Sequence, residues 1–345
     1  MRGYAPNGAM KSNKHYTIPV FIPFAGCPFK CVFCDQNRIT SRDGLPSPGD
    51  IVRIAETYLG TLPVDGAEIE IGFFGGTFTG LPIELQKKYL DTARTLIENT
   101  AISSIRLSTR PDRIDKQVIG LLRNYPVGTI ELGVQSLDDH VLQLSGRGHT
   151  ALDTLNASRL IKEAGFRLGH QIMIGLPGDT RETSMKTASD SAAMRPDDVR
   201  LYPVLVIEGT RLAEDYHAGR YSPLPLDDAV RIAADIIPLY EQAGAKIIRA
   251  GLHPSEELTS DGKLLAGPYH PSFKELVMTE LWRREFESLP GDRLKHLKLT
   301  VPSHEINAAA GYRGQNKKLL IGKYRAVSFR GSDSLDGRRY DAVLD

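Results

Sequence analysis

All three cysteines of this chain lie within eleven residues, FAGCPFKCVFC at positions 24–34. Cys27, Cys31 and Cys34 follow the spacing C-x3-C-x2-C, and the 345 residues contain no fourth cysteine. Structural zinc usually takes four protein ligands. A cuboidal four-iron cluster takes one thiolate per iron, so three cysteines would leave one iron free to bind a substrate or cofactor. The spacing therefore predicts a metal or cluster site rather than three ordinary buried thiols. Zinc is the main alternative to an iron–sulfur cluster.

Further polar motifs follow the apolar segments of the first 250 residues. In chain order after the cysteine loop they are GGTFTG (75–80), TRPD (109–112), QSLDD (135–139), LPGDT (176–180) and VLVIEGT (204–210). Each follows a short apolar run that is typical of a buried strand. In parallel α/β proteins the C-terminal ends of the strands share one face, and that face carries the active site. The motifs therefore predict one pocket.

The elements that must position these motifs alternate along the chain. Short apolar runs predict strands over 18–24, 68–74, 104–108, 129–134, 169–175, 198–204 and 245–250. Longer segments between them have helical spacing, for example 83–98, 151–165 and 225–244. Strict alternation indicates parallel βαβ units in an α/β protein. Six or seven such units favour a partial or full parallel (β/α) barrel over a short doubly wound sheet.

The pattern changes after residue 250. Residues 251–271 are rich in Gly, Pro and polar residues and predict a long loop, and a helix is expected over 272–289. Strand-like runs follow at 296–301 and 324–329. We therefore expect three parts, which are a flexible N-terminal segment over 1–16, the barrel over 17–250 and a smaller C-terminal α+β cap over 251–345.

Composition and charge limit the possible partners and location. The net charge is +1, from 43 basic and 42 acidic residues, so it gives no support for nucleic-acid binding, and DNA is not expected as a partner. The most basic short stretch, GYRGQNKK (311–318), is interpreted as a solvated loop leading into a helix, with RNA contact as the alternative. The sequence contains no run of 18 apolar residues, so no membrane span is predicted. The N-terminus lacks the apolar region of a secretory signal. The expected location is the cytoplasm.

The cysteine loop resembles that of the radical S-adenosylmethionine (radical SAM) superfamily. CPFKCVFC has the spacing of that family and its aromatic residue, Phe33, just before the third cysteine. The resemblance implies a [4Fe–4S] cluster whose open iron binds the methionine end of S-adenosylmethionine (SAM). It also implies an electron donor, flavodoxin-like or ferredoxin-like, and reductive cleavage of SAM to a 5′-deoxyadenosyl radical that abstracts hydrogen from the substrate. The cofactor carries that chemistry.

Two more motifs are similar to those of the same family. FFGGTFTG resembles its glycine motif, which implies that Gly75, Gly76 and Thr77 offer backbone atoms to the methionine ammonium group. IMIGLPGDT resembles the motif after its fifth strand, which implies that Ile174 and Gly175 lie near the adenine.

A finer resemblance is to the branch that contains the radical SAM domain of the Elongator catalytic subunit and oxygen-independent coproporphyrinogen oxidase. STRPD, ELGVQSLDDHVLQLSGRGHT and the run from Leu201 to Pro225 are similar to the Elongator domain. This implies that Thr109, Gln135, Arg147 and Gln171 line the cofactor, with Arg147 suited to pair with the methionine carboxylate. No segment after the barrel resembles the Elongator acetyltransferase domain, so acetyl-CoA chemistry is not expected.

The substrate stays open at this stage. A small molecule is favoured because the net charge is near zero, and tRNA is possible. The alternative in another functional class is a non-catalytic iron–sulfur or zinc-binding module, for which the glycine motif and Arg147 would be superfluous. A radical must be shielded from solvent and from unintended hydrogen donors. We therefore expect residues 251–271 to form a lid beside the cofactor pocket, with His270 facing the substrate.

Overall fold

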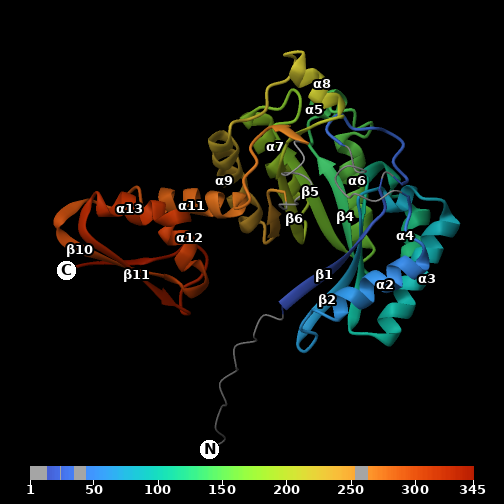
Figure 1. Ribbon diagram of the computed structural model, residues 1–345, viewed down its shortest axis with the longest axis horizontal. Coiled ribbons are helices and arrows are strands. Elements are labelled where there is room, and N and C mark those ends of the chain that lie inside the picture. The colour runs from blue at the N-terminus through green and yellow to red at the C-terminus, as the bar shows by residue number, and fades with distance from the viewer. Residues whose placement is uncertain (1–13, 24, 35–43, 253–262) are drawn as a thin grey trace, which may run out of the picture. The chain divides into compact units, whose positions relative to one another are not determined.

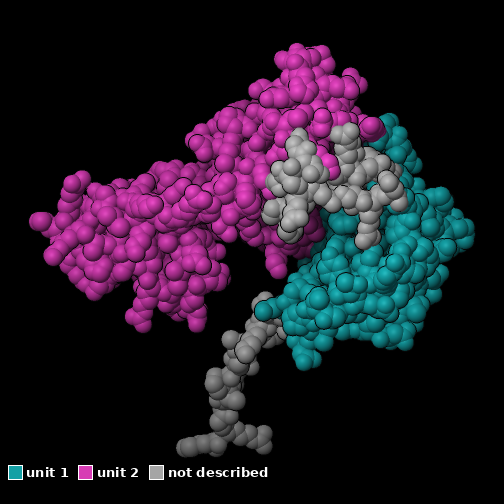
Figure 2. All heavy atoms as spheres, viewed as in Figure 1, with its two compact units in different colours: residues 1–29, 36–133, 152–169 teal, residues 30–35, 134–151, 170–345 magenta. Residues whose placement is uncertain are grey.

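The computed structural model describes residues 14–23, 25–34, 44–252 and 263–345. Within these ranges the chain forms two compact units, coloured separately in Figure 2. Unit 1 comprises residues 1–29, 36–133 and 152–169, and unit 2 comprises residues 30–35, 134–151 and 170–345. The boundary between them passes through the cysteine loop, after Phe29.

The central element is a seven-stranded sheet with the order β1-β2-β3-β4-β5-β6-β8 (Figure 1). Its strands are β1 (Lys14–Phe21), β2 (Ala67–Phe74), β3 (Ile102–Thr109), β4 (Val127–Gln135), β5 (Arg167–Ile174), β6 (Asp198–Pro203) and β8 (Lys246–Ala250). The order follows the chain and the strands run parallel, as in successive βαβ units. The predicted α/β fold, a partial (β/α) barrel, is confirmed.

Alternation along each strand decides which face is apolar. In β2 the side chains of Ile69, Ile71 and Phe73 are fully buried, and the Phe73 ring stacks on Tyr89 of α3 at 5.8 Å between centroids. The residues between them point to the opposite face of the sheet. There Glu70 pairs with Arg106 of the neighbouring strand. The helices therefore cover an apolar face, while the other face carries buried charge.

Helices connect the strands, and five of them begin at a side-chain cap. They are α2 (Pro48–Leu59), α3 (Ile83–Asn99), α4 (Lys116–Leu122), α5 (Asp139–Leu144), α6 (Ala151–Glu163), α7 (Arg181–Ala193), α8 (Arg211–His217) and α9 (Leu226–Gln242). The side chain of Ser47 accepts from the Asp50 amide at the start of α2, and Thr180 caps α7 in the same way. No described helix is long and apolar enough to cross a membrane.

The last part of unit 2 has its own core. It contains α11 (Phe273–Glu285), α12 (Ile306–Ala310), α13 (Gln315–Ile321) and a three-stranded sheet of β11 (Tyr324–Ser332), β10 (Asp292–Pro302) and β12 (Asp341–Leu344). The fully buried Trp282 of α11 and Phe286, which follows that helix directly, pack against Leu297, Leu299 and Val301 of β10. This agrees with the predicted α+β character of the C-terminal region, although β12 in the polar tail was not foreseen.

Strand β1 begins earlier than expected. Lys14 pairs with Ala67 of β2, so residues 14–16 belong to the strand rather than to the N-terminal segment predicted over 1–16. The apolar run alone suggested a start near residue 18, and ladder hydrogen bonds extend the strand through His15 and Tyr16, which carry no apolar signal. The remaining domain boundaries stay a prediction.

Candidate functional site

None of the three cysteines is in a disulfide, and the sulfur atoms of Cys27 and Cys31 each lie beside a polar side chain. Cys31 is buried, whereas Cys27 and Cys34 are partly exposed. In unit 1 the Cys27 sulfur lies 3.1 Å from the Thr77 hydroxyl oxygen. In unit 2 the Arg147 guanidinium donates from Nη1 to the Cys31 sulfur at 3.2 Å. Each unit therefore supplies one hydrogen-bond partner to the cysteine loop.

In unit 1 the glycine motif packs backbone against backbone on the start of the cysteine loop. The Thr77 amide donates to the Ala25 carbonyl oxygen at 2.7 Å. A Cβ atom at Gly76 would lie 2.4 Å from the carbonyl oxygens of both Ile22 and Ala25, so any larger residue would force the segments apart. Glycine is therefore required at position 76 for the close packing of these two segments. This requirement is independent of the contact predicted between the backbone of Gly75, Gly76 and Thr77 and the methionine ammonium group.

The end of β3 places a second group of unit 1 residues beside the same loop. The Thr109 and Thr79 hydroxyl oxygens are 2.6 Å apart and buried. The next residue, Arg110, is buried, pairs with Asp112 and lies with its guanidinium 5.1 Å from the centre of the Phe29 ring. Sequence reasoning named Thr109 but missed Arg110, although the quoted TRPD motif contains it.

In unit 2 the second half of the cysteine loop is held by two other segments. The Val32 amide donates to the Ser145 carbonyl oxygen at 3.1 Å, and the Val32 carbonyl oxygen accepts from the Leu212 amide at 2.8 Å. The amide and the carbonyl group of Val32, between Cys31 and Phe33, are therefore both hydrogen-bonded. This fixes the path of the chain that carries the second cysteine.

Gln135 and Gln171, both predicted to line the cofactor, are neighbours in unit 2. The Gln171 side-chain amide donates to the side-chain oxygen Oε1 of Gln135 at 3.4 Å. Gln135 ends β4 with φ of +66°, a conformation that is uncommon for a residue with a side chain. Backbone strain of this kind gathers at binding sites, where the surrounding structure maintains it.

The end of β5 forms a braced turn at Gly175. Its amide donates to Asp179 at 2.9 Å, and its carbonyl oxygen accepts from the Tyr221 hydroxyl at 2.6 Å. Burial raises the pKa of the Asp179 carboxyl, while hydrogen bonds from Thr183 and Ser184 act in the opposite direction. Burial also raises the pKa of Tyr221, so this hydroxyl keeps its proton and remains a donor. Sequence reasoning named Ile174 and Gly175 but missed both braces.

The predicted lid lies partly outside the described residues, which omit 253–262. Its described end forms β9 (Leu264–Ala266), which pairs with β7 (Val206–Ile207). Leu265 and Ala266 pack on an apolar cluster that also contains Val32 and Phe33 of the cysteine loop. His270 instead contacts Tyr312, with ring centres 5.2 Å apart, and accepts from the Ser272 amide. The position of the lid beside the cofactor pocket and the substrate-facing role of His270 stay predictions.

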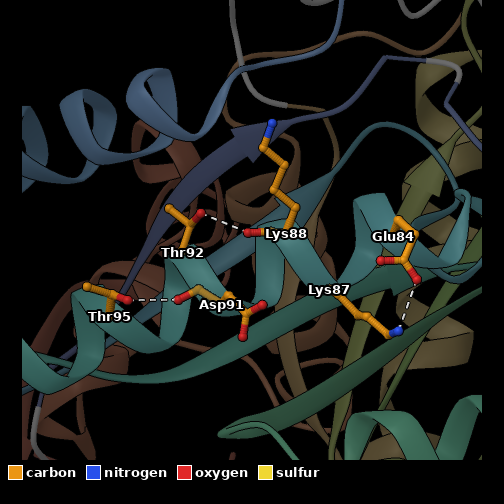
Figure 3. Close-up of a pocket in the computed structure, with 6 residues that line it drawn as sticks. All are labelled: Glu84, Lys87, Lys88, Asp91, Thr92 and Thr95. Carbon is orange, nitrogen blue, oxygen red and sulfur yellow. Dashed lines mark hydrogen bonds and ion pairs between the residues drawn. The ribbon is translucent and has the colours of Figure 1, made fainter.

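A surface hollow on α3 lies among residues outside this constellation (Figure 3). It is lined by Glu84, Lys87, Lys88, Asp91, Thr92 and Thr95, all from one helix. Lys87 pairs with Glu84, and the hydroxyls of Thr92 and Thr95 donate to backbone carbonyls of the same helix. These polar groups are satisfied locally, so the hollow offers no evident ligand chemistry.

The three cysteines can be compared with the ligand requirements of a zinc ion and of a four-iron cluster, the two groups that their spacing suggested. Among the described residues, no set of three or more His, Cys, Asp or Glu side chains is arranged to hold a metal ion. A four-iron cluster does not require its thiolates to converge on one ion, because each binds a different iron. Thiolates of such clusters also accept hydrogen bonds, as Cys31 does here from Arg147, and Cys27 has the Thr77 hydroxyl beside its sulfur. The residues fit a cluster.

Comparison with known proteins gives two adjoining family matches. The model of the radical SAM superfamily matches residues 21–190, and that of the radical SAM C-terminal domain matches residues 196–283. A tRNA uridine(34) acetyltransferase of Methanocaldococcus jannaschii is 33% identical over 194 residues, which cover 50% of this chain and 36% of that protein. Human Elongator complex protein 3 is 30% identical over 192 residues, covering 50% and 35%. The chain thus spans about a third of the length of these two relatives.

A solved structure with the same fold is that of the archaeal Methanocaldococcus infernus Elp3 with an N-terminal deletion. The TM-score is 0.62 at 23% sequence identity, and the superposed part covers 79% of this chain and 64% of that chain. This chain therefore resembles the Elp3 structure in the arrangement of its strands as well as in its sequence motifs.

Proposed function

Because the chain belongs to the radical SAM superfamily, whose members are enzymes that use a [4Fe–4S] cluster and SAM, we propose that Cys27, Cys31 and Cys34 hold that cluster and that the substrate is an RNA. The observation that carries the first part is the set of three cysteines without disulfides, with the Thr77 hydroxyl beside the Cys27 sulfur and the Arg147 guanidinium donating to the Cys31 sulfur. A non-catalytic zinc or iron–sulfur module is the weaker interpretation, because it has no use for the glycine motif, Arg147 and the further motifs at successive strand ends.

The cofactors, when bound, supply a carbon-centred radical that can take a hydrogen atom from an unactivated carbon. The chain's residues would hold and orient them. Thr77 and Arg147 donate to cysteine sulfurs, while the paired amides of Gln135 and Gln171 are suited to hydroxyl and carboxylate groups of SAM. The braced turn at Gly175 would give the adenine a rigid edge to lie against. Phe33 and its apolar cluster help to exclude water.

The preference for a small molecule rested on net charge alone, and the relatives do not support it. Those quoted above are named for tRNA uridine modification and for Elongator. The charge is also uneven along this chain. Residues 290–345 carry eleven Lys and Arg against six Asp and Glu, a net of +5 in a chain whose total is +1. A basic domain is the electrostatic footprint of a nucleic-acid partner, which supports tRNA as the substrate class.

The test of the cofactor assignment is anaerobic reconstitution of the full chain with iron and sulfide. We expect close to four irons per chain. Because radical SAM enzymes need an electron donor, we expect 5′-deoxyadenosine to form from SAM once the protein is reduced. Cys31→Ala should lose both the irons and the product. Stoichiometric zinc without iron in the wild-type protein would overturn the assignment.

The test of the RNA assignment uses charge reversal. Lys317 and Lys318 are exposed on α13, and we expect the double variant Lys317→Glu/Lys318→Glu to weaken tRNA binding by tenfold or more and to reduce its salt dependence. The matched control is Lys87→Glu/Lys88→Glu on α3, which makes the same change in net charge on another helix (Figure 3). Equal loss in both variants, or no tRNA binding by the wild-type chain, would contradict the proposal.

A further inference from the structure

Arg147 contacts a cysteine sulfur, although the sequence assigned it to the carboxylate of SAM. Its Nη1 donates to the Cys31 sulfur at 3.2 Å. Both residues are buried, with 6% of Arg147 and 9% of Cys31 exposed. A guanidinium keeps its charge in proteins, so this is a hydrogen bond from a permanently positive donor in a site largely removed from water.

The backbone around Arg147 is built to present the guanidinium to this sulfur. Gly146 and Gly148, with φ of +65° and +69°, turn the chain on either side of it, and the Arg147 amide donates to the Leu142 carbonyl oxygen. A Cβ atom at Gly146 would lie 3.4 Å from the Lys30 carbonyl oxygen. The Val32 amide also donates to the Ser145 carbonyl oxygen at 3.1 Å, so the arginine segment and the residues flanking Cys31 are joined through main-chain atoms, which limits how far the guanidinium can move away.

The hydrogen bonds to the two cysteine sulfurs are unequal. Cys27 has the neutral hydroxyl of Thr77, whereas Cys31 has the charged guanidinium. The reduced form of an iron–sulfur cluster carries one more negative charge than the oxidised form. A fixed positive donor on a ligand sulfur stabilises the reduced form more, and hydrogen bonds to sulfur are a main determinant of the reduction potential.

We propose that Arg147 is a positioning residue that raises the reduction potential of the cluster through its hydrogen bond to Cys31, before SAM is bound. The inference rests on the proposed cluster and goes beyond it, because it assigns Arg147 to the electron-transfer step. The guanidinium makes the cluster easier to reduce by its donor. A role confined to the SAM carboxylate would leave the potential of the SAM-free protein unchanged.

The experiment is an EPR-monitored redox titration of the reconstituted full chain without SAM. For Arg147→Gln with its four irons retained, we expect the one-electron reduction equilibrium to shift at least tenfold toward the oxidised form, which corresponds to about 59 mV. Arg147→Lys keeps the charge without the planar fork and should titrate between the wild-type protein and Arg147→Gln. Arg181→Gln is the matched control, because its guanidinium is exposed and pairs with Asp235.

A second measurement needs no variant, in case Arg147→Gln loses its irons. In wild-type protein labelled with ¹⁵N-arginine and reduced without SAM, pulsed EPR should detect hyperfine coupling between the cluster and a guanidinium nitrogen. Unchanged midpoints in loaded variants, or no such coupling, would overturn the inference alone. A wild-type chain that takes up no four-iron cluster would overturn the proposed function as well, so the two failures are distinct.

Discussion

The hydroxyl oxygen of Thr77 lies 3.1 Å from the sulfur of Cys27, across 50 residues of sequence. The same threonine donates its amide to Ala25, two residues before that cysteine. Thr77 thus binds the cysteine loop through both its backbone and its side chain. Residues of the glycine motif hold the loop, in addition to any contact they make with SAM.

Thr77→Val removes the hydroxyl while keeping the shape of the side chain. We expect the four irons to be taken up but released to a chelator roughly fivefold faster, which corresponds to about 1 kcal/mol for one lost hydrogen bond. The measurement is the rate of bleaching under anaerobic conditions. Thr95→Val, on the exposed face of α3, should leave that rate unchanged (Figure 3). A Thr77→Val protein that bleaches like the wild type would contradict the assignment.

Gly76→Ala should destabilise the protein even without a cofactor. The added Cβ would lie 2.4 Å from two carbonyl oxygens, so the backbone must shift, at a cost of about 1–3 kcal/mol. Urea denaturation of the apoprotein measures this. Gly120→Ala in α4 is the control, because nothing lies within 4 Å of its Cβ position. That change should stabilise by up to about 1 kcal/mol, since alanine favours a helix interior. Similar effects of both substitutions would refute the steric argument.

Tyr221→Phe removes the hydroxyl that donates to the Gly175 carbonyl oxygen at 2.6 Å. We expect a loss of about 1 kcal/mol in the free energy of unfolding and weaker SAM binding, because the turn that would carry the adenine loses one of its two braces. Denaturation and equilibrium SAM binding report these separately. Tyr58→Phe, on the partly exposed face of α2, should change neither quantity. Unaltered SAM affinity would separate Gly175 from the adenine.

The Glu70–Arg106 pair makes stability depend on pH in the acid range. Burial acts to raise the pKa of Glu70, but the combined hydrogen bonds and charges of His15, Arg106 and Thr17 outweigh it and lower the pKa to about 2. Because the folded pKa lies below the usual value of 4.5, the stabilisation is present above about pH 4.5 and is lost as the pH falls toward 2.

Glu70→Gln should therefore lower the free energy of unfolding by about 3 kcal/mol at pH 7, the order expected when one partner of a buried pair is removed. Arg106 keeps a second carboxylate, Glu131, at 3.4 Å, which limits the loss. The difference from the wild type should shrink as the pH falls from 5 toward 2. Glu84→Gln, in an exposed pair on α3, should show little change at any pH. A pH-independent difference for Glu70→Gln would contradict the assignment.

The order of elements and the location of the chemistry were readable from the sequence. Apolar runs that alternate with helical spacing predicted all seven strands of the main sheet, because strands buried in a parallel sheet need apolar side chains wherever they meet the covering helices. The same pattern located the motifs at the strand ends. The cysteine spacing indicated a metal or cluster site, and the resemblance of the cysteine loop to the radical SAM family implied the cofactor. Strand ends were less well predicted, as at Lys14, because ladder hydrogen bonds extend into polar residues.

Only the tertiary structure decided which atoms meet. Nothing in the spacing pairs Thr77 with Cys27, places Arg147 on the Cys31 sulfur or joins Gln135 to Gln171. The members of each pair come from different strands or loops, up to 116 residues apart. Periodicity encodes which face of an element is buried, but it carries no information about which loop packs on which. That choice depends on main-chain approaches such as Gly76 on Ala25, where a few tenths of an ångström decide whether two segments can touch.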